Sequence, residues 1–260
     1  MDGTLPEIEE SKARGEIARL YHDIRQTMNV PKVNLIYRYF ATIDGGLTAI
    51  WPSLKAHFQS GAFAQIAGDC RAMYRSDDKC ERLISTDCLD PQTRQQIAEI
   101  LDFYLIANPL NLCALEFLAA NLEVSVNIEG TLSPLVSLAD LRKRIETEKF
   151  PAPADELMFL VSQGVASVRP TLLRELQNWP DFIQATSAYM KTCCLDEQFA
   201  AHVSSIRYKV KTQAISLVQE KPISMPTAAA RQIAEFCAYF PVILIRMTLI
   251  ANALRRAVSQ

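Results

Sequence analysis

The word Gln96-Ile97-Ala98-Glu99 returns unchanged as Gln232-Ile233-Ala234-Glu235, an offset of 136 positions. Without a gap, the same offset also pairs Arg38 with Arg174, Ala49 with Ala185, Lys55 with Lys191, Phe63-Ala64 with Phe199-Ala200, and Leu118 with Leu254. One shared offset over about 85 residues is typical of an internal repeat. We therefore expect two equivalent halves, with any functional site between them, where helices of both halves meet.

Helical patterning runs through almost the whole chain. Only 8 of the 260 residues are glycine, and apolar side chains recur at i, i+3 and i+4 nearly everywhere. The pattern predicts an all-α protein in which two pseudo-repeats of helices pack into one globular unit. We expect helices over roughly 16–28, 33–42, 47–58, 62–74, 91–122, 137–147, 154–164, 169–178, 181–193, 197–219 and 226–258.

The chain divides into three parts. Residues 1–123 form the first expected repeat and residues 154–260 the second. The stretch 124–153 has no good counterpart at the common offset and is punctuated by Gly130, Pro134, Pro151 and Pro153, which is typical of a linker. The one short charged helix expected within it has the composition of a solvated face.

The charge balance excludes several classes of partner. With 27 basic and 29 acidic residues and no long basic run, the chain lacks the electrostatic footprint of a nucleic-acid-binding protein. The acidic segment 1–12 has no apolar core of a secretory signal. The apolar stretches 236–245 and 247–254, split by Arg246, fall short of the roughly 18 to 20 residues that a membrane span needs. We expect a cytoplasmic protein without a membrane partner, and a homodimer stays open.

Metal and redox chemistry have little support in the sequence. None of the seven cysteines belongs to a CxxC pair, and the three histidines do not recur at the repeat offset. The adjacent thiols Cys193 and Cys194 have no neighbouring cation in sequence and are expected in the core. No metal site and no cofactor is expected.

Asn108 is the first candidate for a functional residue. The apolar stripe Ile97, Ile100, Leu101, Tyr104 and Leu105 leads directly to Asn108, so an amide points where a core side chain is expected. Pro109 then removes a backbone N–H and bends or breaks the helix. Polar backbone groups beside an inward amide could hold a water or a small polar ligand; alternatively, Asn108 only satisfies the carbonyls that Pro109 frees.

Arg246 and Glu116 each stand alone among apolar residues. A guanidinium stays charged in any protein environment, so a buried Arg246 must find a carboxylate, several carbonyls or an anionic ligand. Two readings stay open. Arg246 pairs with Glu116 inside the protein, or it grips the carboxylate of a small organic acid.

Three further polar residues are weaker candidates. Arg38 and Arg174 occupy the same position in the two repeats, and such symmetric recurrence favours a packing role. Asp102 lies about 120° from Asn108 around the same helix and is expected to face solvent.

With the helical duplication and these words in hand, the chain resembles the group I 2-haloacid dehalogenases. The matching words are Tyr21-His-Asp-Ile-Arg25 before Val30-Pro31, Ala41-Thr42 before the turn Asp44-Gly45-Gly46, Asn108-Pro109, and Asn178-Trp179-Pro180. The resemblance implies an all-helical enzyme with an internal repeat that acts on both enantiomers of small 2-haloalkanoic acids. The fold also resembles the alkylhydroperoxidase D-like helical proteins, but their chemistry needs a CxxC that is absent here.

The resemblance implies roles for several residues. In the family an aspartate acts as general base and an asparagine helps to hold the attacking water. The asparagine corresponds to Asn108, whereas the aspartate position, seven residues before Trp179, holds Leu172, preceded by Thr171. Neither side chain can deprotonate water at neutral pH. Pocket positions that are bulky and apolar in the family hold Lys32 and Leu35.

Together these observations predict a haloacid dehalogenase-like protein that acts on, or binds, a small carboxylic acid between the two repeats. Asn108 would position water and Arg246 or Lys32 would hold the carboxylate. A base, if there is one, would be Glu116, with its pKa tuned by burial. The remaining pocket candidates are Leu35, Thr171, Leu172 and Tyr239. The rival prediction is a non-catalytic helical scaffold or ligand-binding protein that has lost the base.

Overall fold

The computed structural model describes residues 4–74, 84, 86–87, 89–123, 134–218 and 223–259. This described part contains eleven α-helices, one 3-10 helix and no β-strand, which confirms the predicted all-α class. The helices are α1 Gly15–Met28, α2 Leu35–Phe40, α3 Gly46–Gln59, α4 Ala62–Asp69, η1 Arg71–Tyr74, α6 Pro91–Glu123, α7 Leu138–Thr147, α8 Pro153–Val161, α9 Thr171–Leu176, α10 Pro180–Cys194, α11 Glu197–Ile215 and α12 Thr227–Ala257.

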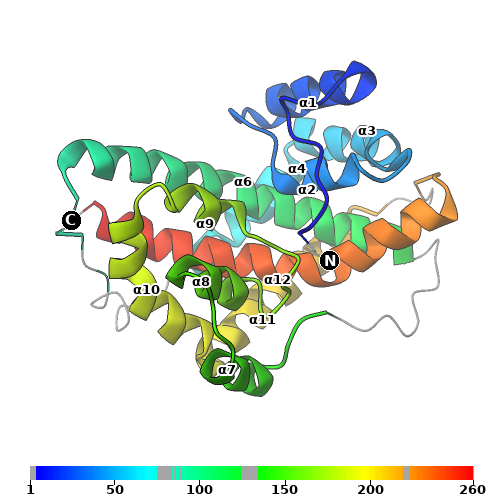
Figure 1. The fold of residues 1–260 in the computed structure, drawn as a ribbon. Coiled ribbons are helices and arrows are strands. Elements are labelled where there is room, and N and C mark those ends of the chain that lie inside the picture. The colour runs from blue at the N-terminus through cyan, green and yellow to red at the C-terminus, as the bar shows by residue number, and fades with distance from the viewer. Residues whose placement is uncertain are drawn as a thin grey trace.

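Two long helices, α6 and α12, form the centre of the molecule and run antiparallel (Figure 1). Near the end of α6 the Oδ1 atom of Asn121 accepts a hydrogen bond from the Ile223 amide just before α12, at 2.9 Å. Nearer the other end of the pair, Arg255 of α12 meets Asp102 of α6 at 2.8 Å. Most side chains of the second half of α12, from Phe240 to Leu254, are buried. The core therefore lies along this pair.

The remaining helices lie on two sides of the central pair. Helices α1 to α4 gather at one end of α6 (Figure 1), whereas α8, α10 and α11 contact α12, and α9 and α11 contact α6. The bounds of α2 and α9 are separated by 136 positions, and α6 and α12 begin at the same separation. Lys55 of α3 pairs with Asp23 of α1 at 2.8 Å, while Lys191 of α10 pairs with Glu156 of α8 at 2.7 Å.

The equal offsets of these helix bounds are what a duplication predicts, and the duplication itself stays a prediction. The two ion pairs correspond only in their lysines, since Asp23 and Glu156 are 133 positions apart. The division into 1–123, 124–153 and 154–260 stays a prediction, because residues 124–133 of the expected linker lie outside the described residues. The predicted short helix of the linker is present as α7.

Several helix boundaries differ from the prediction for identifiable reasons. The expected helix over 62–74 divides at Cys70 into α4 and η1, where the chain tightens to a 3-10 turn. The expected helix over 197–219 ends earlier, at Ile215. Pro109 does not break its helix, because α6 continues through it to Glu123; the proline only deprives the Leu105 carbonyl of its amide partner.

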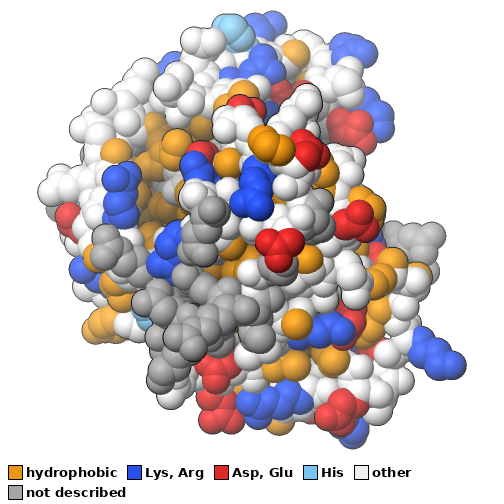
Figure 2. All heavy atoms as spheres, turned by 90° about the vertical axis from the view of Figure 1, so that its left-hand side faces the viewer, with side chains coloured by type: hydrophobic (Ala, Val, Ile, Leu, Met, Phe, Trp, Pro, Cys, Tyr) orange, Lys and Arg blue, Asp and Glu red, His pale blue; other side chains and the backbone are white. Residues whose placement is uncertain are grey.

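By length and apolar composition alone, Pro91–Leu122 and Thr227–Ala257 could each cross a membrane. However, 78% of the most apolar window in each helix is buried inside the protein. Burial on all sides is what the central helices of a helical core require. On the face drawn in Figure 2, basic and acidic side chains are interspersed rather than gathered by sign.

Candidate functional site

A small cavity lies where α2, α6, α9 and α12 meet. Its volume is about 10 Å³, roughly the space that one water needs. Helices from both halves of the chain line it. The lining residues are Asn34, Leu35, Ile36, Asn108, Pro170, Thr171, Phe240, Leu244 and Met247.

Two buried amide side chains give this cavity a polar wall. Asn108 is only 1% exposed, and its Nδ2 donates no hydrogen bond to the described residues. Asn34 occupies the N-cap position of α2 but does not cap the helix, and its Oδ1 also has no hydrogen-bond partner among them. A donor and an acceptor therefore line one cavity, and leaving such groups unpaired costs free energy.

A third amide, Asn111, lies one turn after Asn108 on α6. The Tyr37 hydroxyl donates to Asn111 Oδ1 at 2.9 Å in the buried core, while Asn111 Nδ2 has no partner among the described residues. Burial raises the pKa of Tyr37, so this phenol stays a neutral donor. Asn111 was not predicted as a site residue, although its i+3 spacing from Asn108 places it on the same face of the helix.

The residues carried over from the family pattern are only partly brought together. Leu35 and Thr171 line the cavity beside Asn108, but Leu172 is buried at 1% exposure outside the lining. No carboxylate lies among the lining residues.

Glu175 is the carboxylate nearest in sequence to a residue of the cavity lining, since it lies one turn after Thr171 on α9. Lys32 forms an ion pair with Glu175 and lies 4.7 Å from the ring centre of Phe103. Tyr104 donates to Glu175 Oε1 at 2.7 Å. Burial, and after it the Glu175 carboxylate, raises the pKa of Tyr104 well above its ordinary value. Lys32 is thus engaged outside the cavity, and the i+4 spacing from Thr171 could have identified Glu175.

Arg246 binds several carbonyls, one of the three kinds of partner that the sequence left open for it. It is 1% exposed and donates to the carbonyls of Val161 at 3.2 Å, Leu160 at 2.8 Å and Cys194 at 3.1 Å. These carbonyls belong to the last turns of α8 and α10, where a cation is favoured. The expected Arg246–Glu116 pair is wrong, and Arg246 is a helix-capping residue.

Glu116 and Tyr239 also lie away from the cavity lining. Glu116 is fully buried and pairs with Arg207 of α11 at 2.8 Å, so its charge is held by a cation and not aimed at the cavity. Tyr239 packs against Phe236, with ring centres 5.6 Å apart. Asp102, as expected, is half exposed, and it pairs with Arg255.

Two open hollows adjoin the cavity. One has a volume of about 450 Å³ and shares Thr171 with the cavity lining, and the other has about 290 Å³ and shares Leu35. Within the described ranges, no group of three or more His, Cys, Asp or Glu side chains is placed to hold a metal ion.

Solved structures with the same arrangement of helices are known. A D-2-haloacid dehalogenase in complex with L-LA superimposes with a TM-score of 0.70, covering 99% of this chain and 97% of that one at 13% identity. The fold is that of the D-2-haloacid dehalogenases. A mutant of such a dehalogenase with D-2-CPA superimposes on the same shares of both chains with a TM-score of 0.64 at 12% identity.

The dehalogenase fold is the extent of this similarity. At 12 to 13% identity the similarity shows the fold alone. The ligands bound in those structures are properties of those proteins. No family model and no curated protein matches the sequence.

Proposed function

We propose that this protein binds a small carboxylic acid beside the junction of α2, α6, α9 and α12, without hydrolysing carbon–halogen bonds by the aspartate mechanism. The observation that carries the proposal is the pair of unpartnered groups, Asn108 Nδ2 and Asn34 Oδ1, at one cavity. The dehalogenase-like fold supports a small acid as the ligand class.

The size of the cavity decides what it holds. About 10 Å³ accommodates a water and not an acid, so the acid lies in the adjoining 450 Å³ hollow, which shares Thr171 with the cavity. Asn108 and Asn34 then hold the water, or the polar end of the ligand, on the inner side of Thr171.

The missing base argues against hydrolysis. Leu172 stands at the position of the expected aspartate, and no carboxylate lines the cavity. The four glutamates that line the adjoining 450 Å³ hollow, Glu7, Glu9, Glu10 and Glu175, are each paired with a cation. A water held by two amides keeps its ordinary acidity, because neither amide accepts a proton at neutral pH.

The test combines ligand binding with turnover of racemic 2-chloropropionate. We expect the wild-type protein to bind 2-chloropropionate by NMR titration and to release no halide. Asn108→Leu should weaken binding while the free energy of unfolding stays within about 1 kcal/mol, since the variant removes an unpaired buried amide.

Two outcomes would change the proposal. Halide release by the wild type would establish a hydrolase with another base, and Glu175→Gln would then be the first variant to assay. Absence of 2-chloropropionate binding in both the wild type and Asn108→Leu would favour the non-catalytic scaffold. A Leu172→Asp variant that gains halide release would show that only the base is missing.

A further inference from the structure

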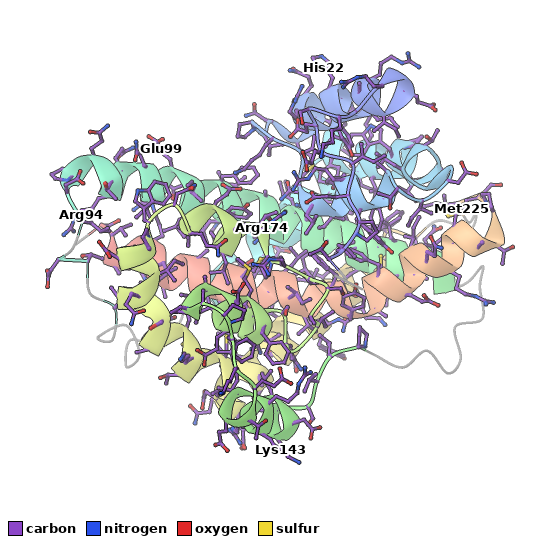
Figure 3. All side chains as sticks on the ribbon, viewed as in Figure 1. His22, Arg94, Glu99, Lys143, Arg174 and Met225 are labelled. Atoms are coloured by element: carbon purple, nitrogen blue, oxygen red, sulfur yellow. The ribbon has the colours of Figure 1, made fainter. Side chains whose placement is uncertain are left out.

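Two arginines at equivalent positions of the two halves meet at one carboxylate. Arg38 is the fourth residue of α2 and Arg174 the fourth residue of α9. Arg38 Nη2 lies 3.1 Å from Oε2 of Glu7, and Arg174 Nη1 lies 2.9 Å from Oε1 of the same carboxylate. Figure 3 labels Arg174 near the middle of the molecule, beside the central helices.

This arrangement has the chemistry of a carboxylate-binding site. Both guanidiniums stay charged, and each places one nitrogen near one oxygen of the carboxylate. Arg174 donates a hydrogen bond to Oε1 of Glu7, whereas Oε2, beside Arg38, accepts none among the described residues. The Arg38 side chain is only 18% exposed and that of Glu7 17%, so water screens this pair weakly, whereas the Arg174 side chain is 35% exposed. Arg38 Nε has no hydrogen-bond partner among the described residues, which leaves a donor for a ligand that reaches further in.

Glu7 belongs to an extended segment that contacts both halves of the chain. Glu10 at the end of this segment pairs with Arg25 and accepts a hydrogen bond from the Val33 amide at 2.7 Å. We call residues 4–10 the N-terminal strap; none of them lies in a helix. The Leu5 amide donates to the Ser167 carbonyl at 2.6 Å, and the Ile8 amide donates to the Arg38 carbonyl at 3.1 Å. The Tyr21 hydroxyl donates to the Ile8 carbonyl at 2.8 Å. The strap thus crosses from one half of the chain to the other over the junction of α2 and α9.

The strap also separates the two hollows beside the cavity. Glu7 and Arg174 line both hollows, and Leu35 and Thr171 connect them to the lining of the cavity at Asn108. A carboxylate bound by the two arginines therefore sits between the surface and that cavity. The Glu7 carboxylate occupies this place in the structure.

We propose that Arg38 and Arg174 bind the carboxylate group of the small acid, and that Glu7 occupies their site as an internal competitor until the acid displaces it. The ligand class rests on the proposed function; the paired arginines and the strap do not. A tethered competitor acts at a high effective concentration. It lowers the apparent affinity for the free acid, because the acid can bind only during the fraction of time in which the strap is open. Removing the Glu7 charge should therefore tighten binding of a free acid.

The experiment titrates propionate into the wild type and variants and follows hydrogen exchange of the strap amides. We expect Glu7→Gln to tighten the dissociation constant by about tenfold or more. Glu16→Gln is the control, because Glu16 is an exposed carboxylate in the first turn of α1 and lines neither hollow. It should leave the affinity unchanged. In the wild type, propionate should speed exchange of the Leu5 and Ile8 amides, since their hydrogen bonds break as the strap leaves.

Adding Arg174→Gln to Glu7→Gln should abolish the gain in propionate affinity. If this double variant does not fold, Arg174→Lys takes the place of Arg174→Gln. The proposal is overturned if Glu7→Gln and Glu16→Gln bind propionate equally, if the gain survives loss of Arg174, or if propionate leaves strap exchange unchanged. Asn108→Leu separates the two proposals. An unchanged propionate affinity in that variant, with the arginine effects present, would remove the cavity from the site and keep the arginine pair. A weaker propionate affinity in Asn108→Leu, without the arginine effects, would keep the cavity and remove the arginine pair. Absence of propionate binding in every variant would remove both proposals.

Discussion

At the residue scale, the sequence identifies which polar side chains are buried but not what they bind. Asn108, Glu116 and Arg246 are all in the interior, at 1%, 0% and 1% exposure, as their apolar neighbours predict. Their partners come from helices far away in sequence, such as Arg207 for Glu116. Helical periodicity gives the direction of a side chain and carries no information about the element that faces it.

The role of Arg246 as a cap for two helices leads to a stability prediction. Arg246→Gln should lower the free energy of unfolding by at least about 3 kcal/mol, since three buried carbonyls lose a charged donor. Arg142→Gln is the control. Arg142 also donates to a carbonyl at the end of α10, that of Leu195 at 2.7 Å, but its side chain is 44% exposed. Arg142→Gln should lower the free energy of unfolding by no more than about 1 kcal/mol. Urea denaturation measures both, and equal losses would contradict the capping role.

At the element scale, the sequence predicted helices far better than it predicted their junctions. Every expected helix has an observed counterpart, because the apolar spacing acts within one helix. The strap was not foreseen, since residues 4–10 carry no helical pattern and their partners, Ser167 and Arg174, come from the other half. The symmetric arginines were expected to have a packing role, and it is the third residue, Glu7, that gives them a joint function in our proposal.

Two ion pairs that join α6 to neighbouring helices allow a matched comparison. Arg207 meets Glu116, and Arg255 meets Asp102, through Nε at 2.8 Å in each pair. The Glu116 side chain is fully buried, whereas Asp102 is 50% exposed. Arg207→Met should therefore cost about 3 kcal/mol of unfolding free energy and Arg255→Met less than about 1 kcal/mol. Guanidinium denaturation would test this, and a larger loss for Arg255→Met would show that burial does not set the strength of these junctions.

At the scale of the whole molecule, burial of phenols determines the response to alkaline pH. Burial is the main cause that raises the pKa of six tyrosines above the ordinary value: Tyr21, Tyr37, Tyr39, Tyr74, Tyr104 and Tyr239. Below about pH 10 these phenols are protonated in both the folded and the unfolded chain, so their contribution to stability is fully present. Above that pH the unfolded chain releases protons that the folded protein keeps, and stability falls.

The expected slope is about 1.4 kcal/mol per pH unit for each phenol that stays protonated in the folded state. Urea denaturation between pH 8 and 11 measures this slope, with tyrosinate absorbance followed in parallel. Tyr37→Phe should reduce the slope by the contribution of about one phenol. Tyr208, whose residue is 75% exposed, provides the control Tyr208→Phe, which should leave the slope unchanged. Ionisation of the phenols well before unfolding would contradict the expected coupling.

The antiparallel central pair also has a consequence for synthesis of the chain. Helix α6 ends at Glu123 and its partner α12 begins at Thr227, 104 positions later. At about 5 to 20 residues per second, translation of that interval takes roughly 5 to 20 s. During this time the apolar side chains of α6 that later face α12 have no native partner on the ribosome. Helices α1 to α4 can already cover part of α6, so the nascent first half must remain soluble with one side of its longest helix uncovered until the C-terminal helix emerges.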